Sequence, residues 1–190
     1  MNSNHQRLCG SPEWAAHLQD TVLARLCATV DLGHRLLEIG PGPGAATDWL
    51  RHRVASLVAI EIDPLAAGAL RERFAGSNVD VVTGDATRLP WPDGSFDAVA
   101  TFTMLHHVPT QRGQNKVLAE ALRVLRPGGV LVASDSLPGT DLHEFHADDT
   151  YNPIDPAGLI ARLQTIGYGG LAVEVGERWT VQAFKPAEDG

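Results

Sequence analysis

Residues 36–44 read Leu-Leu-Glu-Ile-Gly-Pro-Gly-Pro-Gly, and this stretch decides the fold of the chain. The apolar run 35–39 predicts a short strand that is buried on both faces of a parallel sheet. The alternating glycines then leave the backbone free to turn, while the two prolines stiffen the turn. Residues 45–53 read as a helix, whose N-terminus favours an anionic or polar ligand group. We therefore expect a nucleotide-like cofactor against this glycine-rich turn.

A second apolar run, 57–60, ends at Glu61, about 20 residues after the glycines, where an acidic side chain can bind ribose hydroxyls. The glycines fall at every second position, whereas dinucleotide enzymes use Gly-x-Gly-x-x-Gly. A nicotinamide dehydrogenase is therefore disfavoured. The spacing by itself leaves the identity of the nucleoside open.

Four segments follow one another in a fixed order: Glu38–Gly44, Ala59–Asp63, Gly84–Ala86 and Leu125–Gly129. Together they resemble the successive signatures of the class I S-adenosylmethionine-dependent methyltransferases. Two shorter motifs resemble the small-molecule branch of that family, and they are Phe96–Val99 and Leu105–Val108. The resemblance spans residues 35–135 and implies a methyltransferase that uses S-adenosyl-L-methionine as its cofactor.

The resemblance also implies which residues contact the cofactor. Glu61 would bind the ribose, Asp85 the adenine amino group, and the backbone N–H of Ala86 a ring nitrogen. Asp85 equally fits a role as the cap of the turn into Thr87, and both roles stay open. The predicted cofactor contacts are Glu38, Gly40, Gly42, Gly44, Glu61, Ile62, Asp85, Ala86, Thr101, Thr103 and His106.

The fold class predicted from these elements is α/β, with a single Rossmann-like, doubly wound sheet of seven strands. The sheet is mostly parallel, but strand 7 must be antiparallel because the link at 176–178 is too short for a crossover. Predicted strands are 35–39, 57–60, 79–82, 98–102, 130–133, 171–175 and 180–184. Predicted helices are 11–30, 45–53, 64–74, 111–125 and one that begins at 155–156 and includes 160–165. The first helix is expected to pack on the sheet edge.

One domain is expected over residues 1–190, because the chain is too short for two ordinary domains. Residues 1–30 would form an N-terminal arm and helix, residues 35–135 the cofactor-binding core, and residues 134–155 the acceptor-binding segment. The last segment follows the carboxyl end of a strand, which is where ligands gather in open α/β sheets.

The acceptor-binding segment is rich in groups that can do chemistry, namely Asp135, Asp141, His143, Glu144, His146, Asp148, Asp149 and Tyr151. We predict His143 as the catalytic general base, supported by Asp148, with His146 as the second choice. The same groups could instead hold a divalent cation such as magnesium, or form a solvated polar loop.

The double histidine at 106–107 also invites a catalytic interpretation. The sequence favours a structural role for the pair, in which it supports the turn after strand 98–102. His106 is then expected to act as a contact on the cofactor side.

Few aromatic residues occur in the acceptor-binding segment, which favours a polyhydroxylated acceptor over a stacked planar one. Residues 143–149 and the small size resemble the compact actinobacterial sugar O-methyltransferases, which methylate mannose hydroxyls. The sequence thus predicts O-methylation of a small polar acceptor, such as a mannose-type saccharide. Two alternatives stay open: C- or N-methylation of a quinone or other lipophilic metabolite, and a non-catalytic module that binds S-adenosylmethionine.

Composition narrows the partners and the compartment. The formal net charge of −8 and the lack of a basic stripe argue against nucleic acid as a partner. Two cysteines, Cys9 and Cys27, are too few for a disulfide framework and are typical of a protein of the reduced cytosol. A polar start and the lack of an apolar run of about 20 residues argue against a signal peptide and a membrane span. We expect a cytoplasmic protein that is not bound to membranes, and a homodimer stays open.

Overall fold

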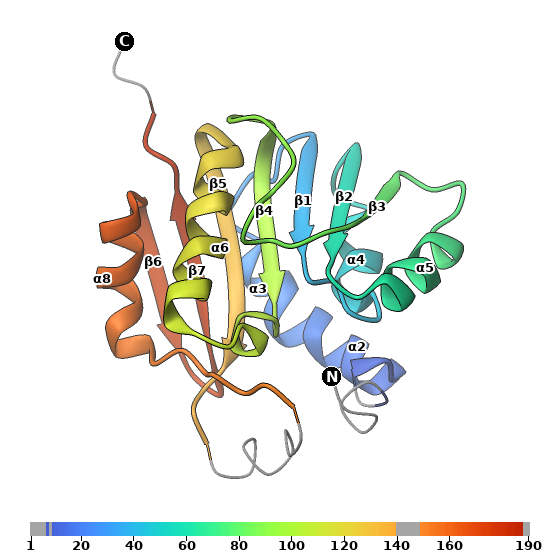
Figure 1. Ribbon diagram of the computed structural model, residues 1–190. Coiled ribbons are helices and arrows are strands. Elements are labelled where there is room, and N and C mark those ends of the chain that lie inside the picture. The colour runs from blue at the N-terminus through green and yellow to red at the C-terminus, as the bar shows by residue number, and fades with distance from the viewer. Residues whose placement is uncertain (1–6, 8, 140–148, 188–190) are drawn as a thin grey trace.

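A single sheet organises the computed structural model, which describes residues 7, 9–139 and 149–187. Its strands are β1 (Arg35–Ile39), β2 (Ser56–Glu61), β3 (Val79–Thr83), β4 (Phe96–Phe102), β5 (Leu125–Ser136), β6 (Gly169–Val175) and β7 (Arg178–Phe184). Their order across the sheet is β3-β2-β1-β4-β5-β7-β6 (Figure 1). The described part of the chain therefore has the predicted seven strands.

The first five strands run parallel to one another, and β7 runs antiparallel to both β5 and β6. The predicted fold class, with its antiparallel strand 7, is confirmed. Both faces of β1 are buried: Leu37 and Ile39 join one apolar cluster, and Leu36 joins the other. A strand that packs on both faces explains why residues 35–39 lack the alternation of a half-exposed strand.

Helices cover both faces of the sheet (Figure 1). They are α2 (Pro12–His17), α3 (Ala24–Leu26), α4 (Ala45–Leu50), α5 (Pro64–Arg73), α6 (Gln111–Val124) and α8 (Pro156–Ile166), with a π-helical stretch Leu18–Leu23 and a 3₁₀ turn Leu105–His107. Helices α6 and α8 pack on one face, whereas α3, α4 and α5 pack on the other. Asp63 and Asp155 cap α5 and α8, and each is followed by a proline at the first helical position.

The N-terminal helix does not pack on the sheet edge, so that expectation was wrong. Its apolar residues join the cluster that covers the central strands β1, β4 and β5. The small residues Ala98 and Ala100 of β4 belong to the same cluster as Leu23 and Leu26. The helix also ends at Leu26, four residues earlier than predicted.

The junction between α6 and β5 also differs from the prediction. The sequence placed a helix over 111–125 and a strand over 130–133, but α6 ends at Val124 and β5 begins at Leu125. Leu125 is fully buried and pairs with Phe96, the first residue of β4. An added Cβ at Gly129 would lie 2.8 Å from the Asp97 carbonyl oxygen, so glycine allows the two strands to meet here.

Within the described part of the chain, no helix is long and apolar enough to cross a membrane.

Gly44 precedes α4 in the left-handed region, with φ +86°, and faces α5. An added Cβ would lie 2.8 Å from Leu70 Cδ2 and 3.0 Å from Phe74 Cε2. We expect Gly44→Ala to lower the free energy of unfolding by about 2–5 kcal/mol, through backbone strain plus overpacking. Gly76→Ala is the matched control, because Gly76 has φ +74° but open space around it, so its loss should be only about 1–2 kcal/mol. Urea unfolding measures both, and equal losses would contradict the packing role.

Candidate active site

The glycine-rich turn has left-handed backbone at Gly40, Gly42 and Gly44, with φ of +66°, +53° and +86°. A Cβ at Gly40 would overlap the Met104 side chain, and one at Gly44 would press on α5. Gly40 and Gly44 therefore serve the packing of the protein itself. The Gly42 N–H donates to Glu61 Oε2 at 3.3 Å, which links the turn to the end of β2.

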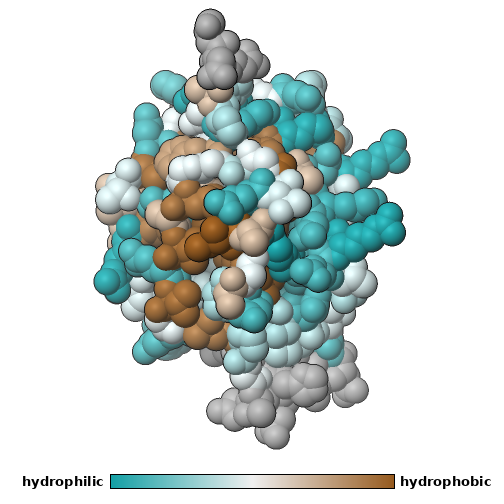
Figure 2. All heavy atoms as spheres, turned by 90° about the vertical axis from the view of Figure 1, so that its left-hand side faces the viewer, coloured by the Kyte–Doolittle hydropathy of each residue, from teal (hydrophilic) through white to brown (hydrophobic). Residues whose placement is uncertain are grey.

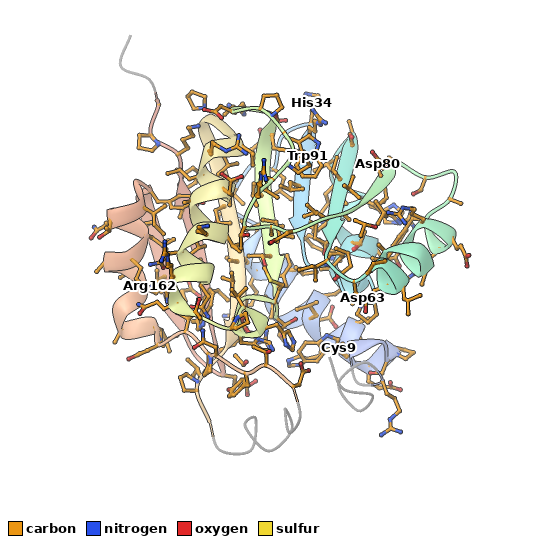
Figure 3. The ribbon with its side chains drawn as sticks, viewed as in Figure 1. Cys9, His34, Asp63, Asp80, Trp91 and Arg162 are labelled. Carbon is orange, nitrogen blue, oxygen red and sulfur yellow. The ribbon has the colours of Figure 1, made fainter. Side chains whose placement is uncertain are left out.

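Glu61 is held in place before any ligand binds. It is 8% exposed, and its second oxygen accepts a hydrogen bond of 3.1 Å from the Asp63 N–H. Ile62, the next residue, is 68% exposed, so an apolar surface lies beside the carboxylate. This pairing suits a nucleoside, because a ribose needs hydrogen-bond acceptors and a purine ring needs an apolar surface. Figure 3 shows Asp63 at this end of the sheet and His34 at the opposite end.

Asp85 follows β3 at the same edge, where it is exposed to solvent. Its Oδ1 accepts a hydrogen bond of 2.8 Å from the Thr87 N–H, so the capping role is confirmed. The contact of Asp85 and Ala86 with adenine stays a prediction.

Glu38 is a buried carboxyl, only 2% exposed, at the end of β1. The Thr47 hydroxyl donates to its Oε2 at 2.6 Å and so ties β1 to α4. Burial raises the pKa of Glu38 to about 7; the Thr47 hydrogen bond opposes this rise, and the charge of Glu61 adds to it. Its protonation state therefore changes near neutral pH.

The end of β4 carries backbone strain. Thr103 has φ +51°, and it is the one non-glycine residue with positive φ in the described ranges. Its N–H donates to the Ser134 carbonyl at 2.9 Å, which holds the strained turn against β5. Two residues earlier, the Thr101 Oγ1 is buried without a hydrogen-bond partner. Strain in a β-branched residue beside an unsatisfied polar atom is typical of a functional site.

A buried histidine–aspartate pair joins the ends of β4 and β5. His106 and Asp135 are 2% and 1% exposed, and His106 Nδ1 lies 2.5 Å from Asp135 Oδ1. The backbone N–H of His106 donates to Asp135 Oδ2 at 3.0 Å, so both carboxylate oxygens face this residue. The Ser136 N–H adds a third hydrogen bond, of 2.8 Å, to Asp135 Oδ1.

Electrostatics fix the tautomer of this pair. Burial acts to raise the pKa of Asp135, but the hydrogen bonds and charge of His106 and the Ser136 N–H outweigh it and hold the pKa below its usual value. Asp135 is then ionised at neutral pH and can only accept hydrogen bonds. The proton of this hydrogen bond therefore lies on His106 Nδ1, which leaves Nε2 as the ring atom that can serve as a general base.

The residues after 148 pack around this pair. The Asn152 N–H donates to the His106 carbonyl at 2.7 Å, and the Tyr151 ring stands edge-on to the imidazole at 5.7 Å between centroids. The ring of His107 lies 4.1 Å from that of His106. Both ends of the predicted acceptor-binding segment, Asp135 and Tyr151, thus meet at His106.

Sequence reasoning therefore found His106 but not its partner. Asp135 was only one of many polar residues in its segment, and the motif 105–108 was interpreted as turn support. The signal that was available was topological: 105–108 follows β4 and Asp135 ends β5, and adjacent parallel strands end side by side. The predicted catalytic residues His143, Asp148 and His146 lie outside the described residues, and their roles stay predictions.

Metal ligands were another expectation for that segment. In the ranges that the structure describes, no group of three or more His, Cys, Asp or Glu side chains could hold a metal ion. The predicted magnesium option concerns residues in 140–148 and stays a prediction.

The family model described as a methyltransferase domain matches residues 37–133, which is half of the chain. This range contains the glycine turn, Glu61 and His106. The chain belongs to this family, the class I S-adenosylmethionine-dependent methyltransferases.

Among curated relatives, the chain is 33% identical over 124 residues to the phthiotriol/phenolphthiotriol dimycocerosates methyltransferase 1 of Mycobacterium ulcerans, covering 64% of this chain and 45% of the relative. It is 31% identical over 153 residues to a probable S-adenosylmethionine-dependent methyltransferase of Mycolicibacterium smegmatis, and the match covers 77% of this chain and 54% of the relative. It is 34% identical over 115 residues to a fatty-acid O-methyltransferase of the same organism, covering 60% and 41%. The chain thus spans about half the length of these relatives.

A solved structure from Pyrococcus horikoshii has the same fold, with a TM-score of 0.76 and 21% identity. The match covers 93% of this chain and 92% of that one.

The family's cofactor is S-adenosylmethionine, and the described residues fit it. The bare turn at Gly42, the carboxylate of Glu61 and the exposed Ile62 lie along one edge, as a nucleoside requires. The unsatisfied Thr101 Oγ1 lies further along the same edge, at the end of β4.

The raised pKa of Glu38 makes stability depend on pH. The pKa of Glu38 is about 7 in the folded chain and 4.5 in the unfolded chain, so the folded chain binds this proton more tightly. Protonation of Glu38 therefore stabilises the fold fully below pH 4.5, and this stabilisation is lost as the pH rises through about 7. In wild type, this group should lower the free energy of unfolding by about 3 kcal/mol between pH 4.5 and pH 8, at about 1.4 kcal/mol per pKa unit. We expect this part of the pH dependence to be absent in Glu38→Gln.

Urea unfolding at these two pH values measures this change, and the exposed Glu72→Gln is the matched control. The same pH dependence in wild type and Glu38→Gln would contradict the raised pKa.

Proposed function

We propose that this protein transfers the methyl group of S-adenosylmethionine to a hydroxyl oxygen of a lipophilic acceptor, with His106 as the catalytic base. The observation that carries the proposal is the buried His106–Asp135 pair, which lies one strand away from the glycine turn. A carboxylate that fixes the tautomer and orientation of a histidine is the usual support of a general base.

When bound, S-adenosylmethionine supplies a methyl group on a positively charged sulfur. Glu61 and the turn at Gly42 hold the nucleoside end, and this fixes the direction from which the methyl group is presented. His106 Nε2 accepts the hydroxyl proton of the acceptor as the carbon–oxygen bond forms and the carbon–sulfur bond breaks. Asp135 keeps the Nδ1 proton in place and stabilises the imidazolium that results.

The acceptor class is inferred from the relatives. Two of them are named for lipid acceptors, phthiotriol dimycocerosates and fatty acids. The saccharide that the sequence favoured has no support among these relatives. A lipophilic acceptor was the alternative that the motif 105–108 suggested, and we propose it here with an oxygen atom as the methylated group.

The cofactor half of the proposal is tested at Glu61. Glu61→Gln removes a charged acceptor from the ribose, and a hydrogen bond to a charged group contributes about 1.5–3 kcal/mol. We therefore expect the Kd for S-adenosylmethionine to rise at least about tenfold. Calorimetry measures the Kd, with Asp80→Asn as the control, since Asp80 is exposed at the opposite end of the sheet (Figure 3). An unchanged Kd in Glu61→Gln would place the nucleoside elsewhere.

The chemical half is tested at His106. We expect His106→Gln to lower kcat by about 100-fold or more, the usual contribution of a general base, and to leave the Kd for S-adenosylmethionine within a factor of three. Asp135→Asn should lower kcat similarly, because it removes the charge that fixes the tautomer. The assay measures release of S-adenosylhomocysteine with long-chain alcohols, hydroxy fatty acids and hexoses as acceptors.

The exposed His52→Gln serves as the control, and His143→Ala tests the base that the sequence predicted. If His143→Ala abolished turnover while His106→Gln retained it, the base would lie in the segment 140–148. If only hexoses were methylated, the lipid acceptor would be wrong.

A further inference from the structure

Arg178, the first residue of β7, is a partly buried cation that the proposed reaction does not use. Its Nη1 atom is buried without a hydrogen-bond partner, although guanidinium nitrogens are strong donors. The guanidinium carbon lies over the Trp14 ring, 5.4 Å from its centre, and this cation–π contact does not satisfy the Nη1 donor.

Arg178 has negatively charged neighbours but no direct ion pair with a described carboxylate. Burial lowers the pKa of Arg178, while the charges of Asp135, Cys9 and Glu177 oppose this effect, yet an arginine remains protonated at neutral pH. Burial raises the pKa of the Cys9 thiol to about 11, so Cys9 is neutral at pH 7. Both oxygens of Asp135 are engaged by His106, and Glu177 is exposed to solvent. The structure records no ion pair of Arg178 with any described carboxylate.

The position of Arg178 relates it to the acceptor rather than to the cofactor. Along the sheet the order is β1, β4, β5, β7, so the glycine turn, the His106–Asp135 pair and Arg178 follow one another at the same edge. Arg178 pairs with Ser136, the neighbour of Asp135, whereas three strand spacings of about 4.8 Å separate β7 from β1. A methyl donor at the turn and an anchor at Arg178 would therefore lie on opposite sides of the base.

We propose that Arg178 binds a carboxylate of the acceptor, so that the substrate class is a hydroxylated fatty acid. This inference rests on the proposed function. A single guanidinium matches a single negative charge, and a phosphate monoester, at about −1.5 to −2, would meet the nearby charges of Asp135 and Glu177 as well. A carboxylate at Nη1 would satisfy the buried donor and the buried charge together.

The geometry also separates the two functional groups of the acceptor. Successive side chains of β7 point to opposite faces of the sheet, so Arg178 and Trp179 lie on different faces. Arg178 lies on the face that carries α2, whereas Asp135, which pairs with Trp179, lies on the other face. The acceptor must therefore cross the end of β5, with several carbon atoms between its carboxylate and its hydroxyl group.

The test compares binding of 10-hydroxydecanoate with that of the neutral 10-hydroxydecanamide, by calorimetry in the presence of S-adenosylhomocysteine. We expect wild type to bind the acid at least tenfold more tightly than the amide, and Arg178→Gln to lose this preference. Arg178→Lys should retain part of it, and the exposed Arg25→Gln should retain all of it. Equal binding of acid and amide by wild type would overturn the proposal, as would a preference that survives in Arg178→Gln.

Thermal unfolding and the Kd for S-adenosylhomocysteine show whether each variant is folded; should Arg178→Gln not fold, the wild-type comparison and Arg178→Lys decide. A methylation assay with the acid and the amide distinguishes the proposed carboxylate site from the proposed reaction. If acid and amide are methylated equally through His106, only the carboxylate site is wrong. If the acid binds through Arg178 but no hydroxyl group is methylated, the carboxylate site stands and the proposed reaction fails.

Discussion

Parallel pairing of β1 with both β2 and β4 is the constraint on which the site depends. It aligns the carboxyl ends of the central strands, so every turn that follows one of them opens at the same edge of the sheet. The glycine turn, Glu61, the strained Thr103 and the His106–Asp135 pair all lie along that edge. Because β1 is buried on both faces, its position is fixed by packing, and the site inherits that rigidity.

Two buried ionisable groups, Glu38 and Asp135, and the partly buried Arg178 lie at or near this edge, and their surroundings differ. Glu38 sits beside a single hydroxyl donor, and burial raises its pKa to about 7. Asp135 receives several hydrogen bonds, and its pKa falls. Arg178 has the face of Trp14 but an unsatisfied Nη1. A buried group that lacks its partners costs free energy in a protein that must also fold, so the unsatisfied group marks a place for a ligand.

The family model matches the part of the chain where the cofactor is expected, and the relatives are matched over only part of their length. The family model ends at residue 133, two residues before Asp135, and the matches cover only 45% and 54% of two of the relatives. The features proposed for the acceptor, Asp135 and Arg178, lie beyond the range of the family model. Cofactor use therefore follows from family membership, whereas the proposed acceptor rests on residues outside the range that the family model matches.

The sequence by itself determined the fold class and the glycine turn, because both depend on local signals such as an apolar run and residues that allow positive φ. The cofactor was implied by the ordered motifs that resemble the methyltransferase family. It did not determine that the first helix joins the cluster on one face of the sheet, since that depends on packing between residues far apart in the chain. Nor did it pair His106 with Asp135 or bring Arg178 beside them. Asp135 lies 29 positions after His106 and 43 positions before Arg178 in the chain. Only the order of the strands, a property of the tertiary structure, brings the three residues together.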